Sequence, residues 1–173
     1  AVANNTLGGG FTSRLMDEIR VNRGLSYGAR SGLDQLRSGG TFTVATYTKN
    51  ATLREAIDVA LEQVRLMRDE PLTAEELAAS QRYISGLFPF RIETNDHLAN
   101  WLTRLSFYGL GEDFVETYRE RIAAVTSADV QRAARDHFHA EDNLVVLLTN
   151  YAETKEQIDG LGEIEVIAKA DLE

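Results

Sequence analysis

The order of predicted helices and strands constrains the fold of this chain more than any other feature. Apolar residues recur at helical spacing from about residue 52 to residue 137, and strand-like stretches lie on both sides of this block. These stretches are residues 25–31, 41–48, 144–149 and 164–167. A block of helices between strands disfavours alternating parallel units. We therefore predict an α+β fold, with helices covering one face of a largely antiparallel sheet.

Local signals place the ends of the first elements. Thr12 or Ser13 can cap a short helix that runs through Asn22, and Gly24 supplies its C-terminal stop. The next two stretches, residues 25–31 and 41–48, are joined by a segment that ends in a glycine pair. This pattern predicts a β-hairpin. The later run at residues 144–149 is continuously apolar, as is typical of a buried strand.

Three predicted helices begin with the same signal, a threonine followed three residues later by an acid. In a capping box these two side chains satisfy backbone N–H groups that the helix leaves unpaired. The pairs are Thr52 with Glu55, Thr73 with Glu76, and Thr126 with Asp129. Further helices are predicted at about residues 97–108, 114–124 and 154–159, and Pro89 is expected to end the helix that starts at Thr73. Neither a repeat nor a linker is visible, so residues 1–173 are predicted to form one domain.

Composition excludes several classes of function. The net charge is −9, from 18 basic and 27 acidic residues, so a nucleic acid is a disfavoured partner. The absence of cysteine excludes thiol catalysis, disulfides and cysteine-ligated zinc. No apolar run approaches the roughly 20 residues that a membrane-spanning helix needs. The compartment stays open, and bacterial periplasm and cytoplasm are both compatible with the sequence.

Catalytic motifs are missing as well. The three histidines are His97, His137 and His139, and none of them forms H-E-x-x-H or the inverted H-x-x-E-H zinc motif. His137 and His139 are two residues apart, so on a helix they would point about 200° apart. The chain has no G-x-S-x-G elbow, and its glycine run at residues 8–10 is not a phosphate loop. We therefore predict that the chain holds no metal and is inactive alone.

A more informative pattern lies near the start of the chain. Residues 7–15 (LGGGFTSRL), 18–20 (EIR) and 23–28 (RGLSYG) resemble the "LGGG-(S/T)-SRL … LRE-x-RGL-(S/A)-Y" signature of pitrilysin/insulinase-type zinc metallopeptidases. Downstream, residues 72–77 (LTAEEL), 107–110 (FYGL) and 125–130 (VTSADV) are similar to further motifs of that family. Their order and spacing fit along nearly the whole chain.

The resemblance implies which part of such an enzyme this chain is. The family pairs two homologous halves, and the half that carries this signature lacks the inverted zinc motif. The chain is therefore expected to be a zinc-free, inactive C-terminal half with a processing-peptidase-like fold. Its partner would be the zinc-bearing half, on the same polypeptide or on a separate subunit. A half normally has a strand and most of a helix before the glycine run, so we expect an N-terminal truncation and a sheet without its first strand.

The resemblance also implies site residues. In the family's zinc-free half an arginine and a tyrosine, seven positions apart, orient the substrate and stabilise the oxyanion; Arg20 and Tyr27 match them. Without the resemblance, Arg20 could equally be a surface ion-pair residue and Tyr27 an ordinary strand aromatic. Gly8, Gly9, Gly10 and Phe11 would bind substrate as a mobile glycine-rich loop. The glycines alone also fit a turn that needs positive φ.

The expected function follows from these implied roles. The chain would be the substrate-binding half that completes the active site of a zinc metalloendopeptidase acting on peptides or unfolded polypeptides. One alternative is a structural or assembly subunit of the same family without peptidase function. Another is a stand-alone peptide-binding module that accepts a bound segment as an added strand.

Overall fold

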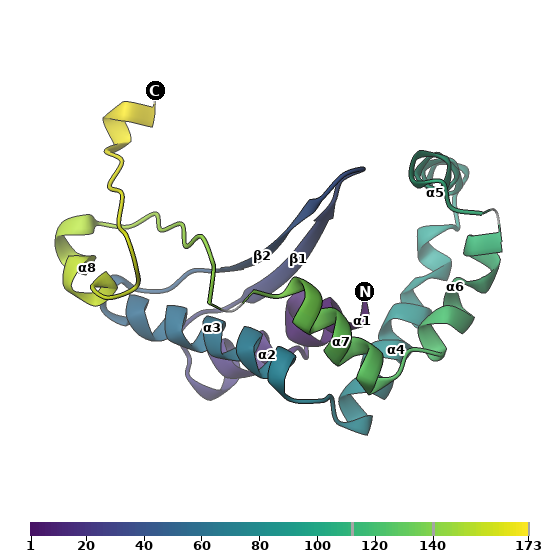
Figure 1. Ribbon diagram of the computed structural model, residues 1–173, viewed down its shortest axis with the longest axis horizontal. Helices are drawn as coiled ribbons and strands as arrows, with labels where there is room; N and C mark the ends of the chain where they lie inside the picture. Colours follow the sequence, from purple (N-terminus) through teal and green to yellow (C-terminus); the bar gives the residue numbers. More distant parts are fainter. Residues whose placement is uncertain (112, 140, 173) are drawn as a thin grey trace.

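The computed structural model describes residues 1–111, 113–139 and 141–172 of the chain. Within them, two strands pair and several helices surround the pair (Figure 1). The strands are β1, Ala29–Gln35, and β2, Gly40–Thr46. The α-helices are α1 Val2–Asn4, α2 Arg14–Met16, α3 Leu53–Asp69, α4 Ala74–Leu87, α5 Asn95–Tyr108, α6 Asp113–Ala123, α7 Ser127–His137 and α8 Tyr151–Ile158. Two π-helical segments, η1 Asn5–Gly9 and η2 Asp17–Asn22, extend α1 and α2, and short 3-10 turns occupy Asn50–Thr52, Pro89–Arg91 and Lys169–Leu172.

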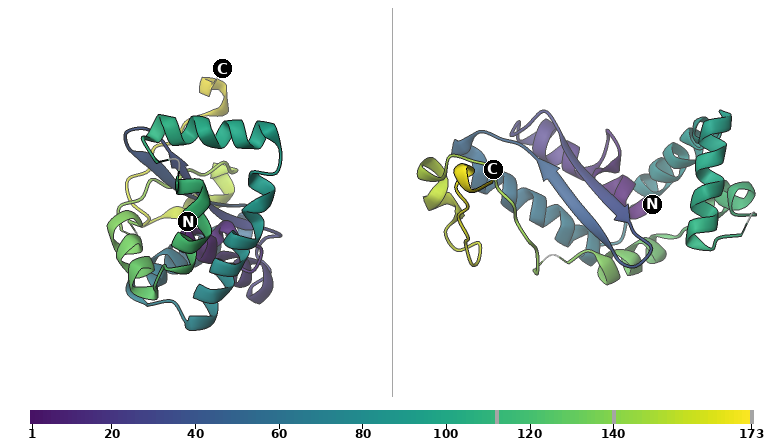
Figure 2. Two further views of the ribbon diagram at one scale, coloured as in Figure 1. Left: turned by 90° about the vertical axis from the view of Figure 1, so that its right-hand side faces the viewer. Right: turned by 90° about the horizontal axis from the view of Figure 1, so that it is seen from above.

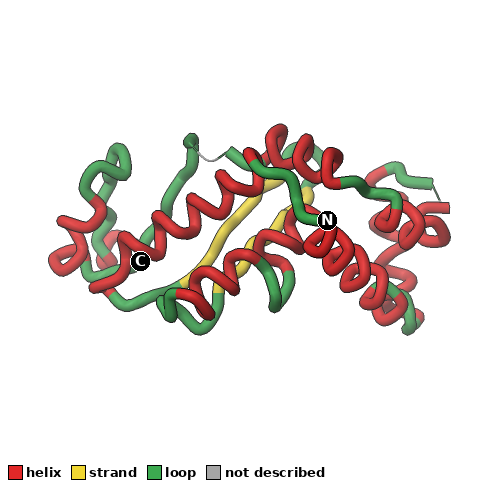
Figure 3. The backbone as a smooth tube through the Cα atoms, turned by 90° about the horizontal axis from the view of Figure 1, so that it is seen from below, coloured by secondary structure: helices red, strands yellow, loops and turns green. Residues whose placement is uncertain are grey.

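Helices lie along one side of the hairpin, and the others extend to its two ends. Figure 1 shows α2 and α3 beneath the β1–β2 hairpin, with α4, α5 and α6 at one end of the molecule and α8 at the other. Seen from below in Figure 3, the helices lie in front of the strands. At the hairpin's tip the Tyr108 hydroxyl donates to the Gln35 carbonyl oxygen at 2.7 Å, which ties the tip to α5 (Figure 2). The predicted α+β class is confirmed.

The sheet is smaller than the sequence predicts. β1 and β2 pair antiparallel from Ala29 opposite Thr46 to Gln35 opposite Gly40, which confirms the hairpin. The prediction of strands at residues 144–149 and 164–167 is wrong for the described residues, because both stretches lie outside the two-stranded sheet. An apolar run becomes a buried strand only where a neighbouring strand pairs with its backbone.

The core forms where the hairpin, α2 and α3 meet. Leu7, Leu15 and Ile19 are fully buried, and Val64 and Met67 of α3 join them in one hydrophobic cluster. Phe138, just after α7, stacks on Phe42 of β2 with ring centroids 4.1 Å apart. These contacts fix the N-terminal segment and the hairpin against α3, and that segment carries the predicted site.

Two of the three predicted capping boxes are confirmed. Both reciprocal hydrogen bonds are present at Thr73 and at Thr126. At Thr52 the prediction is wrong, because its hydroxyl bonds to the Thr48 hydroxyl at 2.7 Å. Glu55, the expected second partner, instead forms an ion pair with Arg23 at 3.3 Å.

An ion pair between α2 and α4 gives a first prediction. Arg14 binds both carboxylate oxygens of Glu76, at 2.7 and 3.1 Å, and both side chains are partly buried. The hydrogen bond from Arg14 is the main cause that lowers the pKa of Glu76 below its ordinary value of 4.5. We expect Glu76→Gln to lower the free energy of unfolding by about 1–2 kcal/mol at neutral pH, because it breaks a partly buried pair.

The pH dependence of this loss has a definite sign. A lowered folded-state pKa stabilises the fold above about pH 4.5, and that contribution disappears as the pH falls below this value. Urea unfolding should therefore show a smaller effect of Glu76→Gln at pH 3 than at pH 7. Glutamine can still serve the capping box, so the variant isolates the charge. Glu75→Gln, at an exposed neighbour, is the matched control, and an equal loss at both pH values would contradict the assignment.

Candidate functional site

The glycine run begins inside the protein. Gly8 is buried in η1, and a Cβ atom added to it would lie 2.4 Å from the Ser31 backbone nitrogen and 2.7 Å from Leu15 Cδ1. The interpretation of the run as a turn with positive φ is wrong, because none of residues 8–10 has a positive φ. Gly8 is required for space: only a residue without a side chain lets η1 approach β1 this closely.

The run then leads outward to an exposed aromatic ring. Gly9 is exposed and lies next to the Asn4 side chain. Gly10 adopts an extended conformation with φ −120° and ψ 161°. Phe11 follows with 71% of its surface exposed. Among the four predicted substrate-binding residues, Gly8 is therefore internal, whereas Phe11 is largely exposed.

Arg20 contacts this ring. Its guanidinium carbon lies 4.9 Å from the centroid of the Phe11 ring, a cation–π geometry. Arg20 is half-buried in η2, and π-helical segments of this kind are rare and often occur at functional sites. In the described part of the chain, Arg20 makes neither an ion pair nor a hydrogen bond. A guanidinium on a ring face still carries N–H groups around its edge that can donate to a ligand.

Tyr27 lies seven residues later, in the turn between η2 and β1. It is 85% exposed, and its phenol makes no hydrogen bond among the described residues. The next residue, Gly28, begins the wall of a small pocket at the base of the hairpin, about 250 Å³ in volume. That pocket is lined by Gly28, Ala29, Arg30, Ala45, Thr46 and Tyr47. The structure brings Arg20 and Phe11 together, and within the described residues neither hydrogen bonding nor ring stacking joins Tyr27 to them.

Two features of this region were not predicted from the sequence. One is the Arg14–Glu76 ion pair, which joins two motifs 62 residues apart. The other is the pocket beside Tyr27, whose walls come from both strands of the hairpin. The spacing of residues within a motif predicts neither the ion pair nor the pocket. The one local signal is that β2 alternates apolar and small polar residues and contains no charged side chain.

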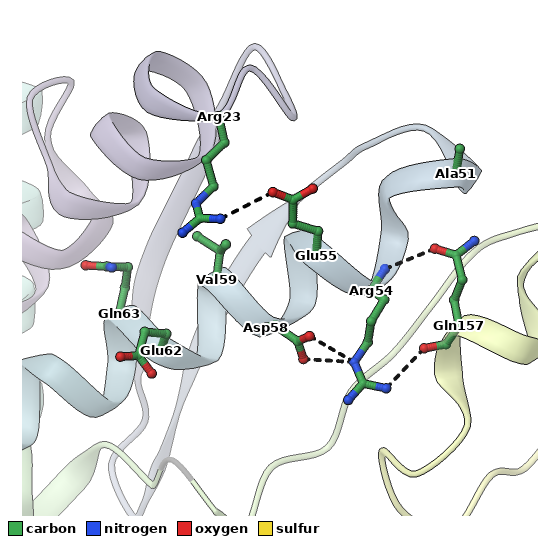
Figure 4. A pocket seen from close by; sticks show the side chains of 9 residues that line it. All are labelled: Arg23, Ala51, Arg54, Glu55, Asp58, Val59, Glu62, Gln63 and Gln157. Atoms are coloured by element: carbon green, nitrogen blue, oxygen red, sulfur yellow. Dashed lines mark hydrogen bonds and ion pairs between the residues drawn. The ribbon is translucent and has the colours of Figure 1, made fainter.

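A larger open pocket of about 610 Å³ lies between α3, α8 and the end of η2 (Figure 4). Both of its arginines are paired with carboxylates of the lining. Arg23 pairs with Glu55 at 3.3 Å, and Arg54 pairs with Asp58 at 2.9 Å while donating to the Gln157 carbonyl at 3.3 Å. These bonds fasten α3 to α8 and η2, so we assign the pocket a structural role.

The family resemblance places zinc in the partner half and none in this chain. Within residues 1–111, 113–139 and 141–172, no three histidine, cysteine or acidic side chains gather as a metal site would require. His97 lies beside the Phe90 carbonyl oxygen, with its Nδ1 atom 3.1 Å away, and His137 ends α7. The described helices also include none that is long and apolar enough to cross a membrane.

Comparison with known proteins confirms the family that the motifs predicted. Residues 1–84, which hold the glycine run, Arg20 and Tyr27, match the family described as "Peptidase M16 inactive domain". A crystal structure of a peptidase M16 inactive domain from Pseudomonas fluorescens is similar, with a TM-score of 0.74 and 26% sequence identity. That match covers 80% of this chain and 33% of the Pseudomonas chain.

Relatives with curated names carry two different descriptions. An uncharacterized zinc protease from Streptomyces coelicolor is 27% identical over 84% of this chain. The non-peptidase homolog YmxG from Helicobacter pylori is 26% identical over 86% of it. The chain spans about a third of the length of both relatives, 32% and 34%. The chain is thus similar to the inactive domain of zinc protease-like proteins, and such proteins include one named as lacking peptidase activity.

Proposed function

We propose that this chain is the substrate-binding half that completes the active site of a zinc metalloendopeptidase, with zinc held by a partner half. The observation that carries the proposal is a pair of hydrogen-bond donors in the family signature, neither of which has a hydrogen-bond partner among the described residues. Arg20 is oriented by the Phe11 ring, and Tyr27 is exposed beside a pocket at the hairpin's base. Peptides or unfolded polypeptides are the proposed substrates.

The chemistry of these two donors suits acyl transfer from a peptide bond. Attack on a carbonyl group moves negative charge onto its oxygen. A guanidinium and a phenol can hydrogen-bond to that oxygen more strongly as the charge grows. Arg20 would also orient the substrate backbone, while an extended peptide would occupy the pocket beside Tyr27.

The test uses the assembled two-half enzyme carrying both Arg20→Ala and Tyr27→Phe. We expect cleavage of a quenched fluorescent peptide to fall at least as far as the hundredfold typical of one lost oxyanion donor. Arg82→Ala with Tyr83→Phe is the matched control, because both residues are exposed on α4. Full activity of the Arg20/Tyr27 double variant would remove the assigned roles.

A structural or assembly role is the second candidate, and the description of the Helicobacter pylori relative as a non-peptidase homolog favours it. The partner's sequence separates the two. An intact inverted zinc motif in the partner half supports the peptidase, whereas a degraded motif supports the scaffold.

Phe11 gives a graded prediction about positioning. We expect Phe11→Ala to raise KM a few-fold in the assembled enzyme with a smaller change in kcat. The exposed cation–π contact that it removes is worth about 0.5–1 kcal/mol. Phe11→Tyr keeps an aromatic face for Arg20 and should restore KM. Steady-state kinetics of both variants check this, and an equal rise of KM in Phe11→Tyr would show that the ring does not act through Arg20.

A further inference from the structure

The pocket beside Tyr27 contains a positive charge that has no partner in the described part of the chain. Arg30 is exposed and lines this pocket of about 250 Å³ at the base of the hairpin. Among the described residues, its guanidinium forms neither an ion pair nor a cation–π contact. A guanidinium has five N–H donors and no acceptor, and a carboxylate matches its planar fork with two parallel hydrogen bonds. The pocket therefore offers a site for a carboxylate.

The alternation of β1 places Arg30 on the face of the hairpin away from α3. Ala29 and Ser31 are 6% and 7% exposed, and Ala29 belongs to the hydrophobic cluster that includes residues of α3. Successive side chains of a strand point to opposite faces, so Arg30 lies on the other face from these two residues. The right-hand view of Figure 2, from above, shows both strands in front of α3. Arg30 is therefore accessible to a ligand of this chain.

The pairing register explains why a pocket forms around Arg30. Arg30 lies opposite Ala45, and two positions along the same register places Gly28 opposite Tyr47. Residues directly opposite one another in an antiparallel pair share a face. A Cβ atom added to Gly28 would meet nothing within 4 Å, so the two small residues leave open space between the Arg30 and Tyr47 side chains. At about 250 Å³, the pocket is smaller than the roughly 300–1,000 Å³ of small-molecule sites and suits one side chain.

The charge distribution along the chain supports an acidic ligand at this pocket. Residues 1–49, which hold the signature and the hairpin, contain six basic and three acidic side chains, whereas residues 50–173 contain 12 basic and 24 acidic ones. The two strands contain one acid, Asp34, four residues beyond Arg30 and so about 13 Å away at the rise of a strand. A positively charged segment of an otherwise acidic protein attracts a negatively charged ligand and disfavours a basic one.

We propose that this pocket selects an aspartate or glutamate side chain of the peptide substrate, with Arg30 as the residue that determines this specificity. The inference rests on the proposed function, since its ligand is the extended peptide placed beside Tyr27. Arg30 follows Tyr27 by three positions, so at about 3.8 Å per residue the acid would lie within about three residues of the bond that is cleaved. The Arg30 guanidinium would hold the carboxylate through two hydrogen bonds, and Tyr47 forms another wall of the pocket.

Binding of short peptides to the full chain tests the inference without any cleavage. The probes are heptapeptides of alanine and threonine that carry a dye at the N-terminus, an amidated C-terminus, and glutamate, glutamine or lysine at the central position. We expect fluorescence anisotropy to show that the glutamate peptide binds about fivefold more tightly than the glutamine peptide, and that the lysine peptide binds most weakly. The preference should shrink at high salt, because the charge of Arg30 is exposed to solvent.

A charge-reversal variant and a matched control assign the preference to Arg30. Arg30→Glu should reverse the order, so that the lysine peptide binds most tightly, and this gain also shows that the variant is folded. Arg37→Glu makes the same change in net charge at an exposed position beyond the end of β1, and it should keep the preference for glutamate. An equal loss of preference in both variants would mean that net charge, and not the pocket, selects the peptide.

Three further outcomes overturn the inference. If no peptide binds at millimolar concentration, or if all three bind equally, the pocket does not select an acid. If a glutamine peptide with a free C-terminus binds as tightly as the amidated glutamate peptide, the pocket recognises a chain end and not an acidic side chain. The proposed catalytic roles fail separately: a glutamate preference alongside full activity of the Arg20→Ala and Tyr27→Phe double variant would remove those roles alone, and cleavage without the preference would remove this inference alone.

Discussion

Replacing Tyr27 by phenylalanine is expected to lower kcat of the assembled peptidase a hundredfold or more while changing KM little. The variant removes one hydroxyl group from a side chain that is 85% exposed, so the fold of this chain should not change. A donor that binds the oxyanion more strongly than the ground-state carbonyl acts on kcat, and the loss of one such donor typically costs about 3 kcal/mol.

The control for this variant is Tyr83→Phe, which removes the same atom from an exposed tyrosine on α4. Steady-state kinetics should leave that control at wild-type activity. A rise in KM alone for Tyr27→Phe would assign the phenol to ground-state binding instead of oxyanion stabilisation. Unchanged kinetics would leave Tyr27 without a role in the reaction.

The largest expected effect on folding comes from Gly8→Ala. The added methyl carbon would lie 2.4 Å from the backbone nitrogen of Ser31, and a backbone atom has less freedom to move away than the end of a side chain. Relief requires η1 and β1 to separate, which would disrupt the packing of Leu7 and Leu15. We expect a loss of about 3 kcal/mol in the free energy of unfolding, at the upper end of overpacking costs.

Gly86→Ala is the matched control for that substitution. Gly86 lies in α4 with open space where its Cβ would be, so alanine should raise the free energy of unfolding by up to about 1 kcal/mol. Urea unfolding of the two variants should therefore give shifts of opposite sign. A stable Gly8→Ala variant would mean that the close approach of η1 to β1 is not required.

The helices could be predicted from the sequence because their signals are local. The capping boxes at Thr73 and Thr126 mark where two helices begin. Gly24 and Gly109, which both have positive φ, mark where two others end. The failure at Thr52 involves partners outside the capping pattern. Thr52 has the capping pattern, yet Thr48 and Arg23 take its hydroxyl and the Glu55 carboxylate.

The candidate site shows the same division. The motif places Arg20 and Tyr27 at the spacing of the family signature. Whether another residue accepts a hydrogen bond from either side chain depends on the fold. The structure places Arg20 on the Phe11 ring and leaves Tyr27 exposed. Gly8 could be recognised as important from the sequence, whereas its reason, contact with Ser31, depends on a residue 23 positions away. The apolar run at 144–149 has strand character, yet pairing requires a neighbour that local sequence does not supply.

The central claim is that this chain completes an active site whose zinc is held by another half. The most direct test is cleavage of a quenched fluorescent peptide by the matching zinc-bearing half, measured alone and with this chain added. We expect cleavage only when both are present, with activity that saturates at one chain per zinc-bearing half. A zinc-bearing half that cleaves equally well without this chain would contradict it.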